Sequence, residues 1–182
     1  MINLILGTFY IFKNKMYNRT YTNDIPRIEP KMPWYRQYSY FYAPPNNIIN
    51  GLYLGSSYNA YNWNHITQNR INVIINITQE IDNFYPNYLT YYKFRILDNN
   101  IDDISLILNQ TYQIIDRHLL NGDRILVHCY MGASRSASVI INYLMRKNNL
   151  TYIQAKNYVL NIRPVVNLSV KFDQTLRTPL LE

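Results

Sequence analysis

Residues 124–145 read RILVHCYMGASRSASVIINYLM. The apolar run 124–128 predicts a buried strand, and the apolar run 137–145 predicts a buried helix. Cys129 therefore stands at the end of a strand, and the loop after it leads into the N-terminus of a helix. Such a loop directs several backbone N–H groups at one point, and the helix dipole adds partial positive charge there. This arrangement favours the binding of a phosphate dianion and stabilises a thiolate.

The polar residues of this loop are spaced for the cleavage of a phosphate ester. Cys129 at the floor is placed to attack phosphorus, and Arg135 at the rim is placed to hold two phosphoryl oxygens with its planar guanidinium. Gly132 permits a backbone conformation that a side chain would forbid, and Ser136 is placed to donate a hydrogen bond to the sulfur. A buried structural cysteine followed by a solvated arginine would explain Cys129 alone. The whole set on a strand–loop–helix unit predicts catalysis.

Residues 128–136 have the form His-Cys-x-x-Gly-x-Ser-Arg-Ser, which resembles the signature of the cysteine-based protein tyrosine phosphatases. Residues 134–138 resemble the dual-specificity branch in particular, and the similarity extends over about residues 46–178, including the strand-like stretches 50–56 and 70–78. The resemblance implies a phosphatase that uses no metal or other cofactor. It also implies that the substrate phosphate is bound by the loop residues Tyr130, Met131, Gly132, Ala133, Ser134 and Arg135.

The closing segment of the chain both matches the family and departs from it. Arg163-Pro164, Phe172 and Leu176 resemble the end of the family's domain. Leu168-Ser169 stands where the family often has Pro-Asn, which leaves the start of the last helix open.

The mechanism also needs an acid to protonate the departing oxygen. In the family this is an Asp about thirty residues before the Cys, and Asp98 occupies that position at the end of the alternating strand 91–97. Asp102 and Asp103 are alternatives, but they directly precede the helical pattern 104–120, where Asp commonly caps a helix. We therefore predict Asp98 as the acid, and Asp102 or Asp103 as the cap.

His128 is predicted to orient the loop by hydrogen bonding and to help keep the thiol ionised.

A metal site is not expected, because His65 and His118 lie in unrelated helical patterns and the chain has a single Cys. That single Cys also excludes an intrachain disulfide, and a catalytic thiolate needs a reducing compartment. No stretch of the sequence is long and apolar enough to predict a membrane span. The need for a reducing compartment predicts the cytoplasm or another such compartment. Asn, Ile and Tyr, which have AT-rich codons, are abundant and suggest an AT-rich genome, that of a large DNA virus or of a unicellular organism; a viral source would also allow a virion.

The first forty-five residues differ from the rest and predict an N-terminal arm. They contain five of the eight prolines and six basic against two acidic residues, within a chain of net charge +7. Aromatic residues alternate with these charges, a pattern that is able to bind nucleic acid. We favour an extended arm that packs on the domain or on a second copy of the chain, because the Pro and Tyr content and the apolar run 4–12 suit packing. Nucleic acid and membrane are not expected as partners. We expect instead a homodimer formed through the arm.

The remaining residues, 46–182, predict one catalytic domain of the α/β class with a central, mainly parallel sheet. Strands are expected near 52–55, 72–77, 91–97 and 124–128. Helices are expected near 58–69, 104–120, 135–148, 151–162 and 169–177. The catalytic loop then lies at the carboxyl end of a strand, where such sheets bind ligands.

Three functions are compatible with these features. The first is a protein phosphatase acting on phosphotyrosine and on phosphoserine or phosphothreonine. The second is a phosphatase of the same mechanism acting on RNA 5′ ends or phosphoinositides, but such enzymes often carry extra basic residues in the loop, and this loop has no Lys. The third is a phosphobinding module without activity, which would need the loss of Cys129 or Arg135.

Overall fold

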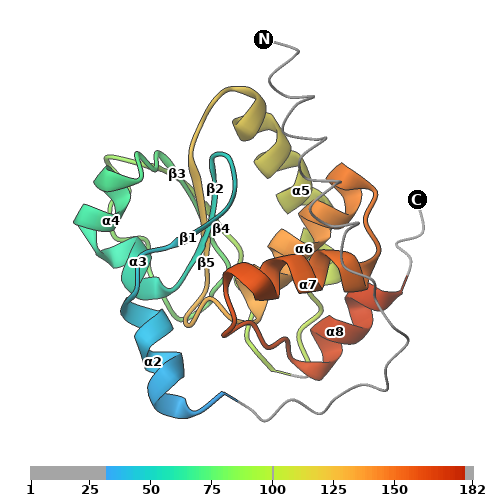
Figure 1. Ribbon diagram of the computed structural model, residues 1–182. Helices are drawn as coiled ribbons and strands as arrows, with labels where there is room; N and C mark the ends of the chain where they lie inside the picture. The colour runs from blue at the N-terminus through green and yellow to red at the C-terminus, as the bar shows by residue number, and fades with distance from the viewer. Residues whose placement is uncertain (1–31, 100, 179–182) are drawn as a thin grey trace. The chain divides into compact units, whose positions relative to one another are not determined.

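The computed structural model describes residues 32–99 and 101–178. Its centre is a five-stranded sheet with the order β1-β2-β5-β3-β4 (Figure 1). The strands are β1 (Asn46–Ile49), β2 (Leu52–Gly55), β3 (Val73–Asn76), β4 (Thr90–Lys93) and β5 (Ile125–His128). β1 is antiparallel to β2, and the other neighbouring strands are parallel, so the predicted α/β class with a mainly parallel sheet is confirmed.

Helices cover both faces of this sheet (Figure 1). They are α2 (Trp34–Tyr42), α3 (Ser57–Tyr61), α4 (Trp63–Gln68), α5 (Ser105–Leu120), α6 (Arg135–Asn148), α7 (Tyr152–Ile162) and α8 (Val170–Arg177). Successive strand residues point to opposite faces. In β5, Ile125 and Val127 therefore join the larger core with α5 to α8, while Leu126 joins a smaller core with Ala60 of α3 and Ile66 of α4.

The register of the three central strands sets the position of the catalytic loop. Gly55 of β2 and Asn76 of β3 both pair with His128, the last residue of β5. The carboxyl ends of these strands therefore meet at one edge, and Cys129 emerges between its two neighbours. This is the edge at which open parallel sheets bind their ligands.

Four details differ from the expected elements. β4 ends at Lys93 and not near residue 97, so Asp98 lies in the connection after the strand. β1 was not expected, and the helix expected over 58–69 is two helices, because the Asn62 side chain accepts from the backbone N–H groups of Asn64 and His65 and starts α4. In the predicted arm, residues 34–42 form α2, although no side chain of this helix is buried. The part of the arm before residue 32 lies outside the described residues.

Candidate active site

Cys129 lies at the floor of the loop between β5 and α6 and is only 1% exposed. Its sulfur accepts hydrogen bonds from the backbone N–H of Gly132 and from the hydroxyl of Ser136, each at 3.2 Å. Both donors come from the loop and the first turn of α6, where the helix dipole is positive. The sulfur is therefore held in surroundings that stabilise a thiolate.

The carbonyl groups of the loop are bound by donors that lie around it. Ser57 of α3 donates from its backbone N–H to the Tyr130 oxygen at 2.9 Å, and Asn167 does the same to the Ala133 oxygen at 2.9 Å. Arg163 donates from Nη2 to the Met131 oxygen at 2.9 Å and from Nε to the Gly132 oxygen at 2.8 Å. Because donors outside the loop bind these carbonyl oxygens, the peptide units direct their N–H groups toward the centre of the loop. This is the geometry of an anion-binding nest.

Gly132 is required at its position by two independent constraints. Its φ angle is +72°, in the region that residues with a side chain rarely adopt. A Cβ placed there would also lie 2.4 Å from the carbonyl oxygen of Gly55. The loop therefore packs backbone against backbone on the end of β2.

Arg135, the first residue of α6, turns its side chain back over the loop and is buried. Its Nη2 lies 2.7 Å from Oε1 of Glu80, and its Nη1 donates to Oε2 of Glu80 at 2.9 Å and to the Ile96 carbonyl oxygen at 3.0 Å. Burial lowers the pKa of Arg135, but the hydrogen bond to Glu80 and the charges around it outweigh burial and leave the pKa raised. Its buried Nε has no partner among the described residues and remains free for a ligand oxygen.

Asp98 lies beside the loop, where the sequence places it. Its Oδ1 accepts a hydrogen bond from the hydroxyl of Ser134 at 2.8 Å, and that hydroxyl also accepts from the Ser169 N–H at 3.1 Å. The bond from Ser169 connects the start of α8 to the loop, so α8 begins at Val170 although the chain lacks the family's Pro-Asn pair. A carboxyl group next to the loop is placed to exchange a proton with an oxygen bound there.

The two alternative acids have other partners. Oδ2 of Asp102 accepts from the Leu97 N–H at 2.8 Å, within the connection itself. Oδ1 of Asp103 accepts from the N–H of Ser105, the first residue of α5, at 2.9 Å. The hydrogen bond from the Ser105 side chain, together with this backbone bond, lowers the pKa of Asp103. Asp103 thus satisfies an N–H of the first turn of α5, although Ile104 is the residue at the cap position.

His128 is completely buried, and its Nδ1 lies 3.2 Å from the Cys129 carbonyl oxygen. Since a carbonyl oxygen only accepts, Nδ1 carries the proton of this bond. Burial lowers the pKa of His128 to about 4, so the ring is neutral near pH 7. This bond joins His128 to the first residue of the loop, and a neutral ring supplies no positive charge to keep the thiol ionised.

Glu80 and Arg163 were not selected from the sequence. Glu80 lies in the polar connection after β3, and nothing in its neighbourhood signals a role. Arg163 was noted only within the Arg-Pro pair of the closing segment, yet it is fully buried and also reaches Oδ1 of Asn46 at 2.8 Å and the Tyr40 carbonyl oxygen at 3.3 Å. Burial lowers its pKa to about 10. Its partners lie far apart in the sequence, which is why the sequence alone does not reveal them.

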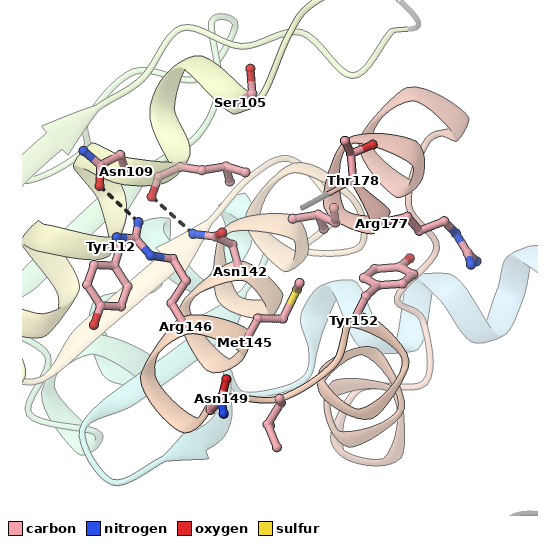
Figure 2. A pocket seen from close by; sticks show the side chains of 13 residues that line it. Ser105, Asn109, Tyr112, Asn142, Met145, Arg146, Asn149, Tyr152, Arg177 and Thr178 are labelled. Carbon is pink, nitrogen blue, oxygen red and sulfur yellow. Dashed lines mark hydrogen bonds between the residues drawn. The ribbon is translucent and has the colours of Figure 1, made fainter. Parts of the chain in front are cut away.

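A pocket of about 850 Å³ lies away from Cys129, among α5, α6, α7 and α8 (Figure 2). No catalytic-loop residue is among the described residues that line it. Its two arginines already have partners: Arg146 stacks over Tyr112 and donates to Asn109, and Arg177 stacks over Tyr152 and bonds Asp173. The pocket therefore contains none of the groups that the catalytic loop assembles.

Two features are absent from residues 32–99 and 101–178. No group of three or more His, Cys, Asp or Glu side chains there is placed to hold a metal ion. No helix in the same residues has both the length and the apolar character needed to cross a membrane.

Comparisons with known proteins agree with this geometry. The family model for the dual specificity phosphatase catalytic domain matches residues 52–178. Protein phosphatase Slingshot homolog 3 of Mus musculus is 38% identical over 133 residues, which is 73% of this chain and 20% of that protein. Protein phosphatase Slingshot of Drosophila melanogaster is 36% identical over 134 residues, 74% of this chain and 13% of that protein. The chain thus spans a fifth or less of the length of these two relatives.

Solved structures are similar over the same region. DUSP15 superposes with a TM-score of 0.70 at 26% identity, covering 73% of this chain and 85% of that one. A human tyrosine phosphatase-like serine/threonine/tyrosine-interacting protein gives a TM-score of 0.69 at 28% identity, covering 73% and 93%. The loop geometry, the family match and these structures confirm the resemblance seen in the sequence: the chain belongs to the dual-specificity phosphatase family of the cysteine-based protein tyrosine phosphatase superfamily.

Proposed function

We propose that this protein hydrolyses phosphotyrosine and phosphoserine or phosphothreonine in proteins through a cysteinyl-phosphate intermediate. The observation that carries the proposal is the position of the Cys129 sulfur. It lies under an amide nest, receives hydrogen bonds from Gly132 and Ser136, and has the buried guanidinium of Arg135 above the same loop. These are the parts that phosphoryl transfer to a thiolate requires.

In the first step the Cys129 thiolate attacks phosphorus. The S–P bond forms as the bond from phosphorus to the leaving oxygen breaks, and Asp98 gives its proton to that oxygen. The loop N–H groups of residues 130–135 and the Nε of Arg135 hold the three other phosphoryl oxygens, on which negative charge accumulates.

In the second step water attacks the phosphorus of the intermediate. The Asp98 carboxylate takes a proton from the water, the S–P bond breaks, and inorganic phosphate leaves. The departing sulfur is a thiolate again, and the Ser136 hydroxyl 3.2 Å away stabilises it. Neither step calls for a metal or another cofactor.

Initial rates on matched substrates test this proposal. The substrates are phosphotyrosine and phosphothreonine peptides of one sequence, an RNA 5′-triphosphate and a phosphoinositide, all measured in EDTA. We expect both peptides to be hydrolysed, and mass spectrometry after rapid acid quenching to find phosphate on Cys129. Hydrolysis of only the RNA end or the phosphoinositide would replace the protein substrate, and an obligate metal requirement would remove the mechanism.

We also propose that residues 1–45 are an N-terminal arm that contributes to a homodimer rather than binding nucleic acid, and that the protein works in a reducing compartment. The support for the arm is its apolar run 4–12 with the Pro- and Tyr-rich continuation. The support for the compartment is the free thiol of Cys129. Removal of residues 1–31 should lower the mass measured by light scattering. Salt-sensitive RNA or DNA binding that disappears with the same deletion would contradict this part of the proposal.

A further inference from the structure

Six aromatic side chains form two groups of neighbouring rings, which together we call the aromatic rim. One group is Phe41, Tyr42, Tyr58 and Tyr130, and the other is Tyr61 and Phe84. We propose that the aromatic rim is the docking surface for apolar side chains that flank the phosphorylated residue of a protein substrate. This inference rests on the proposed function and adds to it a preference for the sequence around the phosphate.

One end of the rim belongs to the catalytic loop itself. Tyr130 directly follows Cys129, and its ring centroid lies 5.6 Å from that of Phe41 in α2. The Phe41 ring lies 6.1 Å from Tyr58 of α3, and the Tyr42 ring lies 4.9 Å from the same Tyr58. A ligand phosphate on the loop would therefore place its neighbouring groups against these rings.

The second group of the rim begins on α3. Tyr61 follows Tyr58 by three residues, one turn along α3, and its ring lies 5.4 Å from that of Phe84. Phe84 belongs to the connection after β3 that also carries Glu80, the carboxylate bound to Arg135. The rim thus includes the residue after Cys129, rings of α2 and α3, and the connection that carries Glu80. Figure 1 shows α2 and α3 adjacent to the loop end of the sheet.

The backbone beneath the rim is fixed, but several of its rings are exposed. The Ser56 hydroxyl donates to the Phe41 carbonyl oxygen at 2.7 Å, and the Asn59 amide donates to the Ala43 oxygen at 2.8 Å. The exposed fractions are 53% for Tyr42, 58% for Tyr61 and 51% for Tyr130. Pre-positioned, half-exposed aromatic rings next to a site are the side chains that most often dominate binding energy at protein interfaces.

The composition of the rim favours a polypeptide as the occupant. None of its six side chains is charged, whereas a nucleic acid groove needs cationic groups that follow the phosphate backbone. An extended peptide rises about 3.3 Å per residue, so residues on either side of the phosphoresidue reach rings next to the loop. Apolar side chains at those positions bury surface against the rim.

Kinetics on two matched phosphotyrosine peptides test the proposal. One peptide has Leu at the two positions on each side of the phosphotyrosine, the other has Ser, and a small aryl phosphate reports the chemistry alone. For the unmodified protein we expect kcat/KM to be roughly tenfold higher on the Leu peptide. Tyr61→Ser and Phe84→Ser should each reduce this preference roughly threefold and leave the aryl phosphate rate unchanged.

Leu106→Ser is the matched control, because Leu106 of α5 is 78% exposed and lies outside the rim; it should leave the peptide preference unchanged. Equal kcat/KM on the two peptides, with normal aryl phosphate hydrolysis, would overturn the rim and keep the phosphatase. A loss of aryl phosphate activity in both rim variants would show that the rings only support the fold. Binding to phosphoinositide vesicles that both rim variants lose, with the peptide preference intact, would assign the surface to a membrane. No hydrolysis of any substrate by the unmodified protein would instead end the proposed function.

Discussion

The catalytic loop is bordered by two buried arginines that differ in their partners. Arg163, on the inner side, bonds four neutral oxygens: those of Gly132, Met131 and Tyr40, and that of the Asn46 side chain. Arg135, at the rim, has a carboxylate partner in Glu80, and its Nε is left unpaired. Burial lowers the pKa of Arg163, whereas the bonds and charges around Arg135 leave its pKa raised despite burial. The N–H groups of Arg163 are bound to oxygens of the loop and its surroundings, whereas Arg135 keeps its Nε free for a ligand. We therefore expect substitutions of Arg135 to reduce the rate, and substitutions of Arg163 to reduce the stability.

The largest expected effect is that of Cys129→Ser. A serine hydroxyl is not ionised in this loop, so turnover should fall by at least ~10⁴-fold, while the nest and Arg135 still bind phosphopeptide. Stopped-assay rates together with calorimetric binding of a phosphotyrosine peptide check both halves of the statement. Activity of this variant above background would remove Cys129 as the nucleophile.

Asp98→Asn should have an effect that depends on the leaving group. A phenol of low pKa leaves without a proton and should be hydrolysed almost normally, whereas phosphoserine and phosphothreonine peptides should lose ~10²–10⁴-fold in kcat. Asp102→Asn and Asp103→Asn are the controls, and both should change rate and stability little, because the Asn oxygen still accepts the backbone N–H bonds of Leu97 and Ser105. The acid is wrongly assigned if one of the controls shows the leaving-group dependence and Asp98→Asn does not.

Arg135→Lys should lower kcat/KM by ~10²–10³-fold, because an ammonium keeps the charge but cannot bond Glu80 and a phosphoryl oxygen in the fixed geometry of a guanidinium. Thermal unfolding of the variant should change little compared with this loss. A rate near that of the unmodified protein would mean that Arg135 is structural, and the contrast with Arg163 would disappear.

Arg163→Lys should show the opposite pattern. A lysine cannot reach four oxygens at once, and buried carbonyl groups left without a donor cost about 1–3 kcal/mol each. We expect the free energy of unfolding to fall by about 3 kcal/mol or more in urea titrations. Among molecules still folded at low temperature, the leaving-group dependence of the rate should be retained, since Asp98 is untouched.

The effect of His128 should be the smallest at pH 7 and should appear only as the pH falls. Its pKa is about 4 in the folded protein against an ordinary 6.5, so the unfolded chain binds more protons between these values. The stability that comes from the neutral ring is fully present above pH 6.5 and falls with the pH. The loss reaches about 3 kcal/mol near pH 4. Urea titrations from pH 7 to pH 4 should show a shallower loss for His128→Asn. The titration of Asp173, whose pKa is lowered to about 2, lies below this range.

The residues found from the sequence are those whose role is local. Cys129, Gly132, Arg135 and Ser136 belong to one strand–loop–helix unit, so their spacing predicts their meeting, and the structure brings all four together. Asp98 was reached by its separation from Cys129 within a resembling family, and the structure places it 2.8 Å from the Ser134 hydroxyl. The strand and helix order followed from periodicity in the same way.

The features that were missed depend on tertiary contacts. Glu80 meets Arg135 only because β3 ends next to β5, and no local pattern encodes that meeting. The break between α3 and α4 depends on one asparagine side chain that satisfies two backbone N–H groups. α2 has no buried side chain, and its carbonyl groups bond Ser56 and Arg163, which lie in other parts of the chain.

The four bonds of Arg163 also indicate which N-terminal residues the domain needs when it is expressed alone. The family match starts at residue 52, yet two of the oxygens that hold Arg163 belong to Tyr40 and Asn46. A protein trimmed to the matched boundaries would keep every group that touches phosphate. It would nevertheless leave a buried guanidinium with half of its acceptors, directly beneath Met131 and Gly132. Part of the N-terminal arm, Tyr40 included, therefore belongs to the support of the loop, upstream of the boundary that family similarity suggests.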